Sequence, residues 1–200
     1  GAVEQGWIPT RMIQIFGGRR HAGGRIDIQD YLVLCPGASS FAAAVEWTAE
    51  IYMATSSLLA SKGLHGVADE GGIWPDFSRN EDGPSYLQQA IETAGFKPLT
   101  EVGIALDVAA TSFWREGRYR LALENRLLDS AQMIEMLDGW CASFPILSIE
   151  DPLGEDDAEG FIEVTRRMGS RIQVVGHDYL TTNAASIVEA GRTHACNAVL

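Results

Sequence analysis

Residues 144–152 read Phe-Pro-Ile-Leu-Ser-Ile-Glu-Asp-Pro, and this stretch decides the fold class. Its short apolar run stops at two carboxylates and a proline, which is typical of a buried parallel strand whose carboxyl end opens into a polar site. Glu150 lies at that end and is a candidate metal ligand. Parallel strands need connecting helices that cover the sheet, so the stretch predicts an α/β fold.

Two further apolar runs end in the same way. Residues 102–106 lead to Asp107, and residues 172–176 lead to His177. In a barrel of parallel strands, side chains from neighbouring carboxyl ends converge on one mouth and can surround one ion. Asp107 lies 43 positions before Glu150, and His177 lies 27 positions after it, so each gap holds one helix with its loops. The spacing therefore predicts that these three side chains meet.

The composition is that of a globular protein with a hydrophobic core, since 46% of the 200 residues are hydrophobic and 21% are charged. The net charge of −12 argues against nucleic acid and anionic membranes as partners. No apolar run approaches the roughly 18–20 residues that span a bilayer, and the first residues lack a signal-peptide pattern. Three widely spaced cysteines in apolar runs indicate a reducing compartment, so we expect a cytoplasmic protein.

The predicted elements follow the order β-β-α-α and then β-α units. Strands at 12–16 and 29–35 are joined by too few residues for a parallel crossover, so we expect them to be antiparallel. A helix follows from Ser40 to Gly63, and its predicted buried face consists of Phe41, Ala44, Val45, Tyr52 and Leu59. Residues 66–75 are aperiodic and rich in glycine, which argues against regular structure there.

The second half of the chain continues the pattern. A helix at 85–94, a hairpin around 115–118 and a helix that begins with an Asp129–Gln132 capping box precede the central strand. Two more helices and a strand at 196–200 follow it. A complete barrel has eight strands and typically about 250 residues, whereas residues 196–200 form only the sixth predicted strand. We therefore expect one folding unit, a partial TIM-type barrel that belongs to a longer protein.

Four motifs carry a resemblance to a known family. They are Asp69-Glu70-Gly71-Gly72, the run from Ala105 to Ala110, the run from Ser148 to Pro152, and Gly23-Gly24 through Gln29. Together with the β-β-α-α-(β-α) order, they resemble the enolases. The resemblance implies that residues 1–200 are a partial C-terminal barrel domain, without the amino-terminal capping domain and the last strands.

The resemblance also implies an activity. Enolases are magnesium-dependent glycolytic lyases that dehydrate 2-phospho-D-glycerate to phosphoenolpyruvate, and they act as cytoplasmic homodimers. By motif, Glu70 matches the general acid, Mg²⁺ would be held by Asp107, Glu150 and His177, and the substrate would be contacted by His21, Gln29 and Asp30. A small-molecule substrate is thus the expected partner.

The chain departs from the family at three points. His177 stands where the family has aspartate, and an imidazole favours zinc, manganese or iron over magnesium. Asp30 replaces a glutamate and is one methylene shorter. The family's base, a lysine, is expected beyond the sixth strand and outside residues 1–200.

Alternatives therefore stay open. His177 is either a substituted ligand or a side chain that does not bind metal, with Asp178 as a further acid at the strand end. A non-catalytic enolase-like binding or interaction protein is the main competing function. Another acid-sugar dehydratase or racemase is a third, but the Asp-Glu-Gly-Gly and Gln-Asp contexts argue against it.

Overall fold

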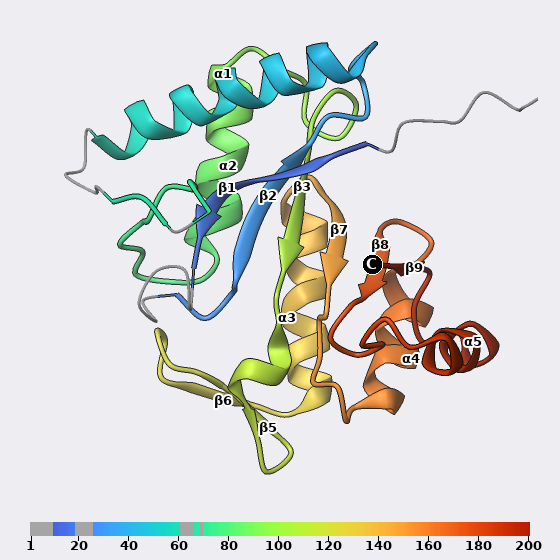
Figure 1. Ribbon diagram of the computed structural model, residues 1–200. Helices are drawn as coiled ribbons and strands as arrows, with labels where there is room; N and C mark the ends of the chain where they lie inside the picture. Colours follow the sequence, from blue (N-terminus) through green and yellow to red (C-terminus); the bar gives the residue numbers. More distant parts are fainter. Residues whose placement is uncertain (1–9, 19–25, 61–65, 69) are drawn as a thin grey trace, which may run out of the picture.

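The computed structural model describes residues 10–18, 26–60, 66–68 and 70–200. Six strands form its main sheet, in the spatial order β1-β2-β3-β7-β8-β9 (Figure 1). Their bounds are Met12–Gly17, Asp30–Leu34, Gly103–Asp107, Ile146–Glu150, Gln173–Gly176 and Ala198–Val199. The three strands predicted to end at polar side chains, β3, β7 and β8, lie next to one another.

Strand direction changes along the sheet. The predicted antiparallel pairing of β1 with β2 is confirmed, and β2 is also antiparallel to β3. From β3 onward every pairing is parallel, as the helical crossovers between the strands require. The carboxyl ends of β3, β7 and β8 therefore share one end of the sheet with the beginning of β2.

Within the described ranges, five α-helices connect the strands of the main sheet. Their bounds are α1 Phe41–Ala60, α2 Asp82–Thr93, α3 Ser130–Ser143, α4 Ala158–Met168 and α5 Ala184–Thr193. The predicted capping box begins α3, since the Gln132 backbone N–H donates to Asp129 and the Asp129 N–H donates to the Gln132 side chain. Helices α3 and α4 contact β7 and β8 respectively, which covers one face of the parallel strands (Figure 1).

The predicted buried face of the first helix is wrong in part. Phe41 and Val45 are 45% and 42% exposed, whereas the residues of α1 that are buried are Thr48, Ile51, Thr55 and Leu59. The two threonines can be buried because each hydroxyl donates to the backbone carbonyl four residues earlier, at 2.8 and 2.7 Å. Hydrophobicity alone predicted the wrong buried face, because small and apolar residues occur on all sides of α1.

A second, smaller sheet lies between β3 and α3. The 3₁₀ helix η1 (Ala110–Phe113) leads into β4 (Trp114–Arg115), β5 (Arg118–Leu121) and β6 (Arg126–Leu128), which pair in that order. The predicted hairpin corresponds to β4 and β5, and the third strand was not predicted. As expected, residues 66–68 and 70–75 form only isolated bridges, of which one joins Ile73 to Phe16 on β1.

The main sheet curves into part of a barrel that does not close, so the predicted partial TIM-type barrel is confirmed. Strands β1 and β9 end the sheet, and a cavity of about 600 Å³ is lined by Met12 on one side and by Val199 on the other. Glu150 also lines this cavity, which places it at the inner surface of the sheet. Among the described residues, no helix is long and apolar enough to cross a membrane.

Candidate active site

Strand register brings three carboxylates to one end of the sheet. Asp107, the last residue of β3, is paired with Asp30 on β2 and with Glu150 on β7. Glu150 in turn is paired with Val175 on β8, so His177 follows just beyond that strand. Adjacent strands lie roughly 5 Å apart, so side chains of paired residues on the same face are neighbours.

Asp107 has a fixed orientation. Its Oδ2 accepts a hydrogen bond of 2.8 Å from the Gln29 side-chain amide, and its Oδ1 accepts one of 3.0 Å from the Ala109 backbone N–H. Burial raises the pKa of Asp107 to about 8, and the nearby carboxylates of Glu150 and Asp30 contribute to the rise, while the Gln29 amide opposes it. Ionisation of this buried carboxyl group is costly, and a nearby cation would stabilise the ionised form.

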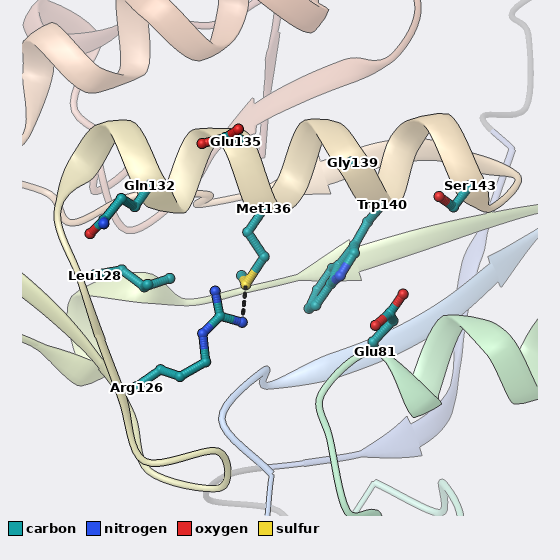
Figure 2. A pocket seen from close by; sticks show the side chains of 9 residues that line it. All are labelled: Glu81, Arg126, Leu128, Gln132, Glu135, Met136, Gly139, Trp140 and Ser143. Atoms are coloured by element: carbon teal, nitrogen blue, oxygen red, sulfur yellow. Dashed lines mark hydrogen bonds between the residues drawn. The ribbon is translucent and has the colours of Figure 1, made fainter.

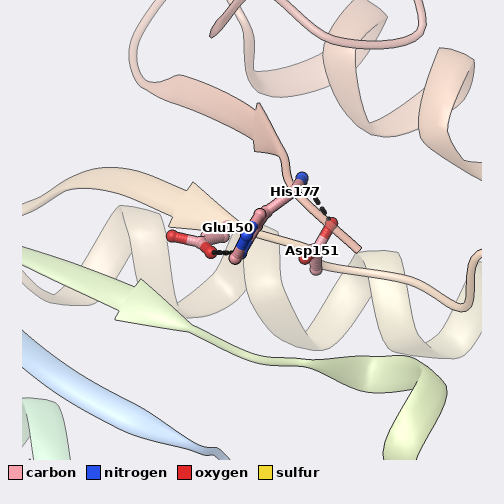
Figure 3. Close-up of side chains that lie close together, drawn as sticks. All are labelled: Glu150, Asp151 and His177. Carbon is pink, nitrogen blue, oxygen red and sulfur yellow. Dashed lines mark hydrogen bonds and ion pairs between the residues drawn. The ribbon is translucent and has the colours of Figure 1, made fainter. Parts of the chain in front are cut away.

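Of the three side chains predicted to meet, Glu150 and His177 are in contact, whereas Asp107 is next to Glu150 by strand register and is not part of the cluster around His177. The Nδ1 atom of His177 lies 2.9 Å from Oε1 of Glu150, and potential ligand atoms of Glu150, Asp151 and His177 all lie within 4.8 Å of one another (Figure 3). Burial and the Asp151 carboxylate raise the pKa of Glu150, and His177 opposes that shift. The His177 side chain is 46% exposed and therefore accessible from the solvent.

Asp151 is a residue of the site that the sequence did not single out. It is 1% exposed, and its φ of 41° lies in the left-handed region, which aspartate tolerates better than most residues. Its carboxylate accepts hydrogen bonds from the backbone N–H groups of His177, Asp178 and Tyr179, at 3.0, 2.7 and 3.3 Å. Asp151 thus holds the turn that places His177. The Glu-Asp-Pro sequence shows this acid but not its partners.

Gln14 is a second residue that sequence reasoning missed. Its side-chain nitrogen donates to Asp30 at 2.5 Å and approaches Glu70 at 3.3 Å, while its side-chain oxygen accepts from the Gly72 backbone N–H at 3.0 Å. Glu70 is exposed, whereas Asp30 is buried. The contact links the loop that carries Glu70 to the carboxylates of the sheet. Its only sequence signal is a polar residue at an inner position of β1.

Six of the seven predicted site residues lie within the described part of the chain, and His21 lies outside it. Asp30, Asp107 and Glu150 form one row, Glu70 joins this row through Gln14, and His177 joins it through Glu150. Gln29, which was predicted to contact the substrate, donates to Asp107 in this structure.

The donor set fits a divalent cation. Within the described residues, no lysine or arginine forms an ion pair with Asp107, Glu150 or Asp151, so no cationic side chain balances these carboxyl groups when they ionise. Hard cations such as Mg²⁺ bind carboxylate oxygens. The imidazole of His177 is a softer nitrogen donor, and it shifts the preference toward later divalent metals.

A second hollow, of about 470 Å³, lies between α3 and β6, away from the candidate site (Figure 2). Arg126 contacts the sulfur of Met136 within it, at 3.9 Å. None of the predicted site residues lines it; its lining consists of Glu81, Arg126, Leu128, Gln132, Glu135, Met136, Gly139, Trp140 and Ser143.

Fold and site together define a βα-barrel protein whose carboxylates gather at the carboxyl ends of its parallel strands, where barrel enzymes have their active sites. Comparison with known proteins identifies the class. The family model "Enolase, C-terminal TIM barrel domain" matches residues 5–200, and the chain belongs to this family.

Curated relatives agree with the family match. The chain is 40% identical over 195 residues to the enolase of a Nitratiruptor species and 41% identical over 197 residues to enolase 1 of Desulfitobacterium hafniense. It is also 40% identical over 195 residues to the enolase of Sulfurimonas denitrificans. Each match covers 96% of this chain but only 45–46% of the relative, so the chain spans about half the length of these relatives.

Proposed function

We propose that residues 1–200 supply the general acid and the metal ligands of a lyase that dehydrates 2-phospho-D-glycerate to phosphoenolpyruvate in glycolysis. The observation that carries the proposal is the row formed by Asp30, Asp107 and Glu150 at one end of the sheet, to which Gln14 connects Glu70. Membership of the enolase family supports the choice of reaction.

The reaction divides into two bond changes. A base removes the C2 proton of the substrate, and the C3 hydroxyl leaves after it is protonated, so that one water molecule is released. We assign the second proton transfer to Glu70, because it is exposed at the mouth and a general acid must reach the departing oxygen. Gln29, Asp30 and His21 are the proposed substrate contacts, and the base is not among the residues assigned here.

Asp107, Glu150 and His177 are the proposed metal ligands. A bound dication supplies positive charge to the substrate carboxylate, which makes the adjacent C2 proton easier to remove. Gln29 and the Ala109 backbone hold Asp107 in place, and Asp151 holds the turn that carries His177. These hydrogen bonds orient the ligand side chains before an ion binds, which favours tight binding of the metal. Magnesium is the family's metal, and the oxygen ligands suit it.

The contact between His177 and Glu150 favours a second candidate function. If His177 remains hydrogen-bonded to Glu150, the imidazole Nδ1 and one Glu150 oxygen engage each other rather than a metal ion. The protein would then be a non-catalytic enolase-like binding or interaction protein. We further propose, from the resemblance alone, that the whole protein is a cytoplasmic homodimer.

The experiment that tests the proposal uses a chimaera in which this chain replaces the matching segment of the Nitratiruptor enolase, which supplies the rest of the barrel. We expect the chimaera to convert 2-phosphoglycerate, as followed by the ultraviolet absorbance of the enol phosphate. Glu70→Gln should lower kcat by about 10²- to 10⁴-fold, the usual contribution of a general acid, with little change in KM.

The matched control is Glu92→Gln, because Glu92 lies on α2 and its side chain contacts Gln88 rather than the mouth. It should leave kcat unchanged. A folded chimaera that binds a divalent cation but shows no turnover would contradict the lyase proposal and favour the binding protein. Equal activities of Glu70→Gln and the unmodified chimaera would refute the role of Glu70.

A further inference from the structure

Gln14 lies between the carboxylates of the sheet and the loop that carries Glu70. Its half-buried side chain extends from β1 toward both the carboxylate on β2 and the loop that includes Glu70 and Gly72. We infer that Gln14 is a positioning residue that holds the Glu70 carboxylate beside Asp30; this inference rests on the proposed function.

The carboxamide group suits this position chemically. A primary amide offers two N–H donors and one carbonyl acceptor. Gln14 directs its nitrogen to Asp30 and Glu70 and its oxygen to the Gly72 backbone N–H, so each end of the amide meets a group of the opposite type. A carboxylate at this position would offer no donor to the two acids. A methionine would have a similar length but no strong hydrogen bond.

The loop has other attachments, but they hold its backbone. The Ile73 N–H donates to Ile15 on β1 at 2.7 Å, and the Tyr52 hydroxyl donates to the Gly71 carbonyl at 3.0 Å. Within the described part of the chain, Gln14 is the one side chain that hydrogen-bonds to the Glu70 carboxylate. Removal of the Gln14 amide should therefore release the Glu70 side chain while the loop stays on β1.

Gly72 gives a second indication that Gln14 is linked to the loop. A Cβ atom at position 72 would meet the side-chain oxygen of Gln14, and no other described group lies so near. The glycine therefore leaves room for the amide to reach the loop backbone. An alanine here would displace the flexible end of Gln14 rather than the backbone, because the obstacle is a side-chain terminus. Gly72→Ala should thus break the connection from the loop side and preserve the fold.

The first arm of the test measures hydrogen exchange by NMR in the 200-residue chain. Gln14→Met should make exchange of the Gly72 backbone amide about fivefold to tenfold faster, since a single hydrogen bond contributes roughly 1 kcal/mol. Gln89→Met is the matched control, because Gln89 lies on α2 and its side chain hydrogen-bonds to Ser85, one turn earlier in the same helix. The Ala122 and Leu123 amides, which donate to Asp27, serve as internal references. Unchanged exchange at Gly72 would overturn the inference.

The second arm measures kinetics in the chimaera described above. Gln14→Met and Gly72→Ala should each lower kcat by about 10- to 100-fold, because a misplaced catalytic group loses that much. Metal affinity should stay constant, since Gln14 does not contact Asp107, Glu150 or His177. In a Glu70→Gln background, Gln14→Met should have no further effect on kcat.

The two arms separate the two claims. An additional loss of kcat from Gln14→Met in the Glu70→Gln background would overturn the positioning role, because Gln14 would then act through another group. If the unmodified chimaera is inactive, the proposed function fails, and the exchange of Gly72 alone decides whether Gln14 holds the loop.

Discussion

Asp107 is the residue whose ionisation should leave the clearest mark on stability. Its pKa rises from 3.8 to about 8 on folding, mainly through burial and then through Glu150 and Asp30. Between these two pH values the metal-free folded state holds a proton that the unfolded state has lost. The free energy of unfolding should therefore fall as pH rises from about 4 to about 8, and then level off.

This pH dependence can be measured by urea denaturation with a chelator present. Asp107→Asn should flatten the decline, and a divalent cation should also reduce it, because the ionised carboxylate would gain a partner. Burial also raises the pKa of Glu150 and of Asp151, so a smaller slope of the same sign should remain. A stability that rises over this range in the metal-free chain would contradict the burial of Asp107.

His177 should set the metal preference. Its Nδ1 lies 2.9 Å from Glu150, which is close enough for both to bind one ion after a small adjustment. We expect His177→Asp to raise the affinity for Mg²⁺ by about tenfold or more and to lower the affinity for Zn²⁺ relative to Mg²⁺, because oxygen replaces nitrogen. Calorimetric titration of each ion measures this.

The matched control is His194→Asp, since His194 is the C-cap of α5, at the end of that helix away from the strand-end carboxylates. It should not alter the affinity for either ion. Equal Mg²⁺ affinities for the unmodified chain and His177→Asp would show that His177 points away from the metal.

The acids at the strand ends could be predicted from the sequence. The residues that hold the site in place through hydrogen bonds could not. Asp107 and Glu150 follow apolar runs, and parallel strands must bring such residues together. Gln14 bonds to loop residues 56 and 58 positions away, and Asp151 bonds to a turn 26 to 28 positions away. Such contacts depend on register and on turn geometry, for which a single sequence has no local signal.

At the scale of elements, Asp27 joins three segments of the chain. It is 2% exposed, and its carboxylate accepts hydrogen bonds from the Asn80 side chain and from the Ala122 and Leu123 backbone N–H groups, at 2.9, 2.9 and 3.2 Å. Asp27→Asn should lower the free energy of unfolding by about 2 kcal/mol, since at least one of these N–H donors loses its carboxylate acceptor. Denaturant titration measures the loss.

Asp76→Asn is the matched control, because Asp76 is exposed and, like Asn80, lies in the segment before helix α2. It should change stability by less than about 0.5 kcal/mol. Equal stability of the two variants would contradict the claim that Asp27 holds these three segments together.

Helix ends could be predicted better than helix faces. The Asp129 capping box was visible as a local pattern and is present in the structure. The buried face of α1 could not be predicted, because its two buried threonines satisfy their hydroxyl groups with hydrogen bonds to the helix backbone. Strand β6 also escaped prediction, since three residues are too few to show a period.

At the scale of the whole molecule, the order of elements predicted a partial barrel, because each βα unit places its strand beside the last. The sequence did not reveal that β2 would pair with β3 across the two intervening helices, since that contact joins elements with α1 and α2 between them in the chain. This pairing sets Asp30 beside Asp107 and so completes the row of carboxylates.

The open sheet should make the 200-residue chain self-associate. Strand β9 ends the sheet, and Val199 within it is 52% exposed. Unpaired edges and exposed apolar residues favour pairing with another chain. Sedimentation should therefore show oligomers, and Val199→Lys should reduce them, because a charge on an edge strand opposes pairing. A monodisperse monomer with a sharp thermal transition would contradict this expectation.

The most direct test of the metal centre is a titration of the folded chain with Mn²⁺, followed by electron paramagnetic resonance. The account predicts a bound ion whose signal is lost in Glu150→Gln and in Asp107→Asn. The signal should persist in Glu163→Gln, which alters a carboxylate on α4 that pairs with Arg166. Binding that is equally strong in all four proteins would contradict the central claim that the strand-end carboxylates hold a divalent cation.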